Sequence, residues 1–173
     1  MKMSDWVVFA IFDFIYLITS CLLAKLVSEL VLWMIDRFVV LSYHDSAVIS
    51  AVTLAVVSVV LVGVLTYRDG YRYATFRLTS SLLSAGAASL LHFAIGLVTR
   101  FAPVLCGPTR HIAGLASYGS FYNSAARAKE IPFGMLAVWG LVMLLVYAAV
   151  MLLMNLVGCR KRLRDRAKTM GAD

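Results

Sequence analysis

Four long stretches of apolar residues dominate the chain, at about residues 6–33, 46–67, 78–99 and 133–157. A helix needs roughly 20 residues to cross about 30 Å of hydrocarbon, and each stretch meets that length. The second stretch is rich in valine, which favours strand in water. In lipid, however, a segment of this length must satisfy its own backbone hydrogen bonds. The pattern therefore predicts an all-α integral membrane protein, a helical bundle of four transmembrane helices.

The connections between these stretches differ in length and chemistry. Residues 38–45 form a short link, and the basic segment from Arg68 to Tyr73 predicts a tight turn in which Gly70 takes a positive φ. The linker 100–132 is long and interrupted by proline and glycine, and its segment 118–129 suits either an amphipathic interfacial helix or an ordered loop. We interpret residues 1–159 as a single membrane domain and residues 160–173 as a basic tail.

Composition and charge place this domain in a membrane. Of 173 residues, 62% are hydrophobic and only 14% are charged, which excludes a soluble domain with a polar surface. The net charge of +7 comes mainly from basic residues at the ends of the apolar stretches. Of the 16 Lys and Arg residues, ten lie on the side of the two termini, six of them in the tail, and the side richer in basic residues is expected to be cytoplasmic. We therefore expect cytoplasmic N and C termini in the plasma membrane, or in the inner membrane of a bacterium. Without an aromatic and basic face, no nucleic-acid partner is expected.

The basic tail has a second predicted role besides fixing orientation. Basic side chains near a membrane surface attract anionic lipid headgroups, at about 1 kcal/mol each. The residues expected to bind headgroups are Arg160, Lys161, Arg162, Arg164, Arg166 and Lys168.

The first stretch has a competing interpretation as a cleaved signal peptide. The segment from Ile18 to Cys21 fits the small-residue pattern of a lipoprotein cleavage site. Asp13 interrupts the apolar run, and the positive charge of Lys2 is offset by Asp5. These charges favour a retained spanning helix.

One face of the third stretch carries small and polar residues at spacings of three and four. Small side chains let membrane helices approach closely, so this pattern predicts a packing face. The polar members of the same face are candidates for the border of a transport pathway. The face comprises Arg77, Ser81, Ala85, Ala88, Ser89, His92, Gly96 and Arg100.

Asp13 and His92 are ionisable residues well inside predicted spans, where such groups are costly and commonly functional. Counting about 1.5 Å per residue from the cytoplasmic ends places Asp13 about 10 Å deep and His92 about 21 Å deep. That gap is too long for a direct hydrogen bond. We expect Asp13 instead to bond Tyr16 on its own helix or to pair with Arg77.

Metal and cofactor chemistry finds little support. His44, Asp45, Cys106 and His111 lie on the predicted outer side and His92 in the outer half of its span, but none has the close spacing of a metal motif. Neither paired cysteines, a second histidine within a span, a serine elbow nor a glycine-rich phosphate loop is present. We expect no metal, no cofactor and no enzymatic activity.

Three functional classes remain. The first is a small non-catalytic subunit that packs through its third helix against a membrane-protein partner or a second copy of itself. The second is a small transporter or channel that uses Asp13 and the polar face of the third helix. The third is a holin-like pore former, since holins also combine few spans with a basic tail.

The single carboxylate of Asp13 in the first of four helices resembles the layout of small multidrug-resistance transporters. That resemblance implies an acid that binds a cation or a proton. The chain departs from the layout in carrying aspartate in place of glutamate and in its long linker 100–132. The resemblance concerns layout alone, with no matching motif around Asp13.

Overall fold

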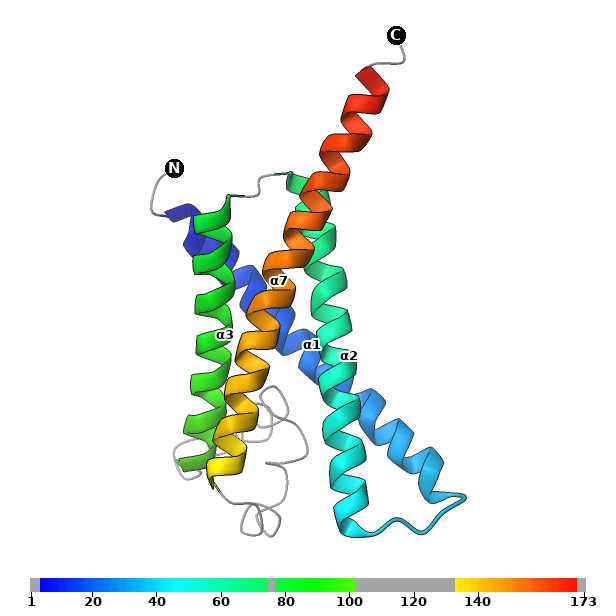
Figure 1. Ribbon diagram of the computed structural model, residues 1–173. Coiled ribbons are helices and arrows are strands. Elements are labelled where there is room, and N and C mark those ends of the chain that lie inside the picture. The colour runs from blue at the N-terminus through cyan, green and yellow to red at the C-terminus, as the bar shows by residue number, and fades with distance from the viewer. Residues whose placement is uncertain (1–3, 75–76, 102–132, 171–173) are drawn as a thin grey trace.

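The computed structural model describes residues 4–74, 77–101 and 133–170, and all regular structure in these ranges is helical (Figure 1). The helices are α1 (Ser4–Asp36), α2 (Tyr43–Tyr73), α3 (Leu78–Phe101) and α7 (Phe133–Met170). Each contains a segment long and apolar enough to span a membrane. The prediction of an all-α, multi-pass membrane protein with four spanning helices is confirmed. The linker 102–132, with Cys106, His111 and the proposed interfacial helix, lies outside the described residues.

The four helices pack as a bundle in which α1 crosses the others obliquely (Figure 1). The most extensive contact joins α2 and α7, while α1 packs on α2 and α3, and α3 also packs on α7. Leu17, Val62, Ala85 and Met151 contribute to one buried core where these helices meet. Many large apolar side chains on the outer faces are exposed, as suits helices whose solvent is lipid.

The prediction of a tight turn at Gly70 is wrong. Helix α2 continues through this segment to Tyr73, and the left-handed residue is Ala74, with φ of 52°. The Ala74 N–H donates to the Gly70 carbonyl at 3.0 Å, which caps the helix. Gly70 is needed for packing instead, since a Cβ there would lie 2.2 Å from the Asn155 backbone oxygen.

Helix α2 begins at Tyr43, earlier than the predicted start at residue 46. Ser42 is the N-cap, and its hydroxyl accepts a hydrogen bond from the Asp45 N–H at 3.2 Å. This cap satisfies a backbone donor that would otherwise be unpaired. The first connection is therefore shorter than the sequence pattern predicted.

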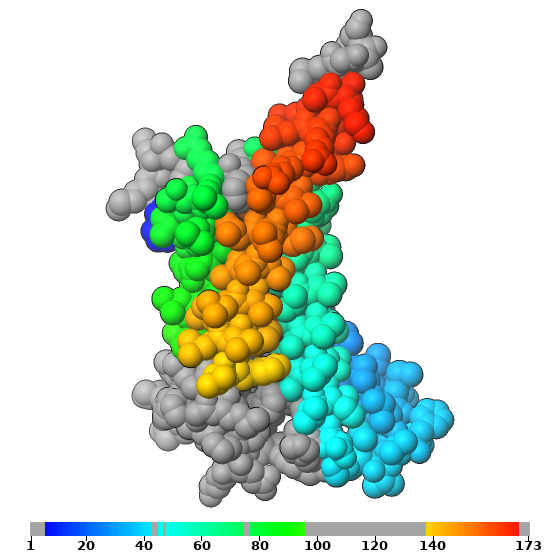
Figure 2. Space-filling model, viewed as in Figure 1, coloured from blue at the N-terminus to red at the C-terminus, as the bar shows by residue number. Residues whose placement is uncertain are grey.

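Helix α7 continues without a break through the basic tail to Met170. Its last turns project beyond the other described helices (Figure 2). Asp165 joins the tail to the bundle, because it accepts a hydrogen bond from Tyr71 of α2 at 3.2 Å. Within α7 it also lies 3.6 Å from Lys161. The basic residues are thus presented on a helix that extends the last span.

Candidate functional site: a polar cavity at one end of the bundle

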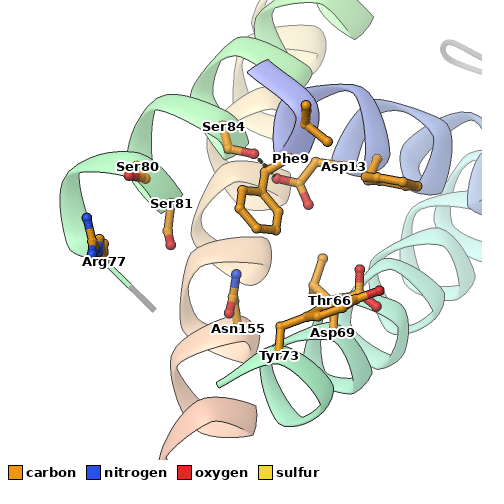
Figure 3. A pocket seen from close by; sticks show the side chains of 12 residues that line it. Phe9, Asp13, Thr66, Asp69, Tyr73, Arg77, Ser80, Ser81, Ser84 and Asn155 are labelled. Atoms are coloured by element: carbon orange, nitrogen blue, oxygen red, sulfur yellow. Dashed lines mark hydrogen bonds between the residues drawn. The ribbon is translucent and has the colours of Figure 1, made fainter. Parts of the chain in front are cut away.

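A cavity of about 450 Å³ lies at the end of the bundle where α1 begins, α2 ends and α3 begins. Its size is typical of small-molecule sites, which occupy roughly 300–1,000 Å³. All four helices contribute to its wall (Figure 3). The lining residues are Val8, Phe9, Phe12, Asp13, Thr66, Asp69, Tyr73, Arg77, Ser80, Ser81, Ser84 and Asn155.

Asp13 is the carboxylate that α1 places in this cavity, and it accepts a hydrogen bond from the Ser84 hydroxyl of α3 (Figure 3). The partners expected from the sequence, Tyr16 and Arg77, are wrong. Tyr16 instead donates to the Asp69 carboxylate on α2 at 2.6 Å. The two α1 side chains thus reach different helices, because Asp13 and Tyr16 point from α1 towards α3 and α2 respectively.

The α2 and α7 walls supply the remaining polar groups. Asp69 stands near the end of α2, with Tyr73 one turn further on. The Thr66 hydroxyl is already bonded to the Val62 carbonyl at 2.8 Å. Asn155 lies on α7 where the Gly70 backbone comes closest, so this close crossing brings the Asn155 amide to the cavity (Figure 3).

The cavity wall combines an excess of negative charge with aromatic surface. Asp13 and Asp69 supply two carboxylates, against the single guanidinium of the exposed Arg77. Phe9 and Phe12 are among the exposed large hydrophobic residues and line the same space. Carboxylates and aromatic faces both attract cations, and the wall is therefore suited to an organic cation.

The face of α3 predicted from its spacing divides between two environments. Arg77 and Ser81 line the cavity, whereas Ala85, Ala88 and Ser89 are buried inside the bundle. Helix α3 packs on α1 and α7 of the same chain, so these buried residues serve internal packing. The surroundings of Gly96 and the side chain of Arg100 lie outside the described set.

His92 belongs to a second polar cluster, buried further along the bundle. Its Nε2 lies 3.6 Å from the Cys21 Sγ, and its ring stands edge-on to Tyr147 with centroids 5.6 Å apart. The Tyr147 hydroxyl lies 3.6 Å from the same thiol and 2.7 Å from the Ser58 hydroxyl. As expected, Asp13 and His92 bond different partners.

Within the residues that the structure describes, no three His, Cys, Asp or Glu side chains come together as a metal site. Of the metal candidates named from sequence, the His44 side chain and the whole of His111 and Cys106 lie outside the described set. Asp45 is engaged in the N-cap of α2. We therefore interpret the cavity as a binding site without a metal.

Three polar cavity residues, Ser84, Asp69 and Asn155, were not predicted from the sequence. Ser84 follows Ser81 by one turn, so the helical spacing already contained that signal. Asn155 is a polar interruption of the last apolar stretch, which is a recognisable mark of an interior-facing position. Asp69 was assigned to a turn, and only the continuation of α2 brings it to the cavity.

Together these features define a four-helix membrane protein with a polar cavity open at one end of the bundle. Neither a family model nor a curated protein nor a solved structure matches the chain.

Proposed function

We propose that this protein is a small membrane transporter whose cavity binds a small organic cation, with Asp13 as the principal counter-charge. The observation that carries the proposal is the placement of Asp13 and Asp69 in one cavity with aromatic side chains, inside a bundle of spanning helices. The hydrogen bond from Ser84 links α3 to Asp13 but does not compensate the charge of the carboxylate, and ionisable groups within spans are commonly functional. Binding of a cation accounts for its presence.

The side chains that line the cavity determine how a cation would bind. The Ser84 hydroxyl orients the Asp13 carboxylate, leaving the other acceptor positions of the two oxygens for a ligand. Phe9, Phe12 and Tyr73 offer ring surface to the apolar part of the cation. Nothing in this mode requires bond making, so the proposed function is transport without enzymatic activity or cofactor.

The orientation of the proposed transporter is set by charge. The start of α1 and the basic end of α7 lie at the same end of the bundle (Figure 1). The cavity is lined by residues at this end. By the distribution of Lys and Arg, we propose that this end faces the cytoplasm of the plasma membrane. The cavity is then the cytoplasmic entrance of the pathway.

The second candidate function is that of a non-catalytic subunit. The structure no longer leaves the α3 face free as its partner surface. The small-residue face of α3 was its predicted partner surface, and that face packs within the chain. A partner or second copy would therefore bind another surface. Co-purification in a fixed ratio with another membrane protein, without any cation binding, would favour this candidate over transport. The holin-like pore former has no specific structural observation in its favour.

The direct test is calorimetric titration of benzyltrimethylammonium into the purified protein in mild detergent, comparing wild type with Asp13→Asn. We expect at least tenfold weaker binding in the variant, or about 1.4 kcal/mol, because the main counter-charge is lost. Asp45→Asn is the matched control, since Asp45 is exposed in the first turn of α2. Its affinity should equal that of wild type.

Equal affinities in wild type, Asp13→Asn and Asp45→Asn would contradict the proposal, because they would show that binding does not occur through the cavity carboxylate. Uptake of the same cation into proteoliposomes then separates binding from transport, and neutral benzyl alcohol serves as the uncharged control.

A further inference from the structure

The centre of the bundle holds four polar side chains, one from each described helix. These are Cys21 of α1, Ser58 of α2, His92 of α3 and Tyr147 of α7, and each is at most 2% exposed. Polar groups at this depth are expensive, and their convergence from four helices is not explained by cation binding in the cavity.

Every member of this cluster can both donate and accept a hydrogen bond. The Tyr147 hydroxyl connects Ser58 at 2.7 Å with the Cys21 thiol at 3.6 Å, and the thiol lies 3.6 Å from the His92 ring. Such a chain can reverse its hydrogen-bond directions when a proton arrives. Of these four side-chain types, imidazole is the one that, when unperturbed, changes its charge near neutral pH.

The cluster lies deeper in the bundle than the cavity, and their separation can be counted along α1 and α3. Asp13 and Cys21 are about 12 Å apart along α1, and Ser84 and His92 are equally far apart along α3, at about 1.5 Å per residue. The fully buried Leu17 lies between the first pair. The layer of side chains at the level of Leu17 therefore separates the cavity from the cluster.

This layer is not wholly apolar. The hydroxyls of Ser20 and Ser89 are 0% exposed and have no hydrogen-bond partner among the described residues. Ser89 stands on α3 between Ser84 and His92, one turn from the imidazole. A buried unpaired hydroxyl costs about 1–3 kcal/mol, and hydration of the layer would remove that cost. Both hydroxyls are groups to which a water molecule in this layer would bond.

The charged groups around His92 are few. On α1, Lys25 lies one turn beyond Cys21 and is paired with Glu29. Ser58 and Tyr147 are the neutral groups that α2 and α7 place at the cluster, and Ser89 is the neighbour on α3. The nearest carboxylate on the cavity side is Asp13. A proton on His92 would thus sit between a compensated Lys25 and an acid that binds the cation.

We propose that His92 is a proton-binding site, reached from the cavity through the Leu17 layer and antagonistic to the cation bound at Asp13. The step is protonation of the neutral imidazole to imidazolium, with the proton taken from cavity water and returned to it. Two positive charges about 12 Å apart repel by an amount worth roughly tenfold in affinity at an effective dielectric constant of about 20. The antagonism rests on the proposed function, whereas proton binding at His92 does not.

Proton binding is tested by NMR of protein labelled only at histidine, in lipid nanodiscs. The chain has 3 histidines, so the His92 signal can be assigned from His92→Gln and, independently, by elimination with His44→Gln and His111→Gln. The expected result is a reversible one-proton shift of the His92 signal between pH 5 and 9. A His92 signal that stays in one protonation state, while the other histidines titrate, would overturn the proposal.

Antagonism is tested by cation titrations across the same pH range in wild type and His92→Gln. Lowering the pH should weaken benzyltrimethylammonium binding by roughly tenfold more in wild type than in the variant. Equal pH dependence in the two proteins would refute the antagonism. If His92 titrates but no cation binds, the proton site stands and the proposed transport function fails. If the cation binds but His92 does not titrate, the proposed cation binding stands and the proton site at His92 fails.

Discussion

The contact between α2 and α7 and the contact between α1 and α3 are built in opposite ways. At the first, glycines let two backbones touch: a Cβ on Gly158 would lie 2.2 Å from the Tyr67 carbonyl oxygen, and Gly70 is equally close to Asn155. At the second, side chains mediate the approach, as in the hydrogen bond from Ser84 to Asp13. The cavity borders the α1–α3 contact, and the close approach of α2 and α7 brings Asp69 and Asn155 to its opposite wall.

The α2–α7 contact serves as the structural scaffold of the bundle, whereas the α1–α3 contact borders the candidate binding site. In lipid, apolar burial gives little driving force between helices, so close van der Waals contact between small residues stabilises the bundle. Further along α2, Gly63 packs against the Val150 side chain, which would lie 3.3 Å from an added Cβ. The α1–α3 contact leaves space and polar groups, which are the requirements of a binding site.

The largest effect is expected at the backbone contact. Gly158→Val inserts a side chain where the Tyr67 carbonyl and the Tyr71 amide already stand, and neither can move without shifting α2. We expect a loss of about 3 kcal/mol of stability, the upper end of the usual cost of overpacking, measured as thermal unfolding in mild detergent. Gly86→Ala is the control, because nothing lies within 4 Å of its added Cβ. That variant should unfold within about 1 kcal/mol of wild type. Similar losses in both variants would remove the distinction between the two contacts.

An intermediate effect is expected at the cavity. Ser84→Ala removes the hydroxyl that bonds Asp13, and hydrogen bonds between membrane helices are worth about 0.6 kcal/mol on average and up to about 1.7. Stability should fall by about that amount, while cation affinity changes by less than in Asp13→Asn. A loss of stability as large as that of Gly158→Val would show that the α1–α3 contact is scaffold as well.

The smallest effect is expected where α7 leaves the bundle. Asp165→Ala removes the ion pair with Lys161 and the acceptor for Tyr71, but these groups are largely at the surface. Exposed pairs of this kind contribute about 0–1 kcal/mol. Unfolding should change by less than about 1 kcal/mol, and cation binding should not change. A large change in binding would show that the projecting end of α7 communicates with the cavity.

The partners of Asp13 show why the candidate site was only partly predictable. Depth counted along straight, parallel helices correctly separated Asp13 from His92, but it proposed Tyr16 or Arg77 as the partner of Asp13. Helix α1 crosses the bundle obliquely (Figure 1). This crossing directs Asp13 to Ser84 and Tyr16 to Asp69. Crossing angles depend on the packing of all helices together and leave no local mark in the sequence.

Gly70 shows the same limit in the backbone. A glycine beside Asp69 and several basic residues is locally typical of a turn, and the sequence pattern predicted one. Contact with the Asn155 backbone accounts for the glycine, and the chain reverses at Ala74 instead. The same contact brings Asp69 and Asn155 to the cavity.

Sequence alone determined the class of the protein and its four spanning helices, because hydrocarbon requires long apolar segments that satisfy their own backbone. It also identified the small and polar residues along α3 and singled out Asp13 and His92. Only the tertiary structure decided that the α3 face packs within the chain, that Asp13 meets Ser84, and that Cys21, Ser58 and Tyr147 gather around His92. Those outcomes follow from how closely and at what angle the helices cross, which depends on contacts between residues far apart in the chain.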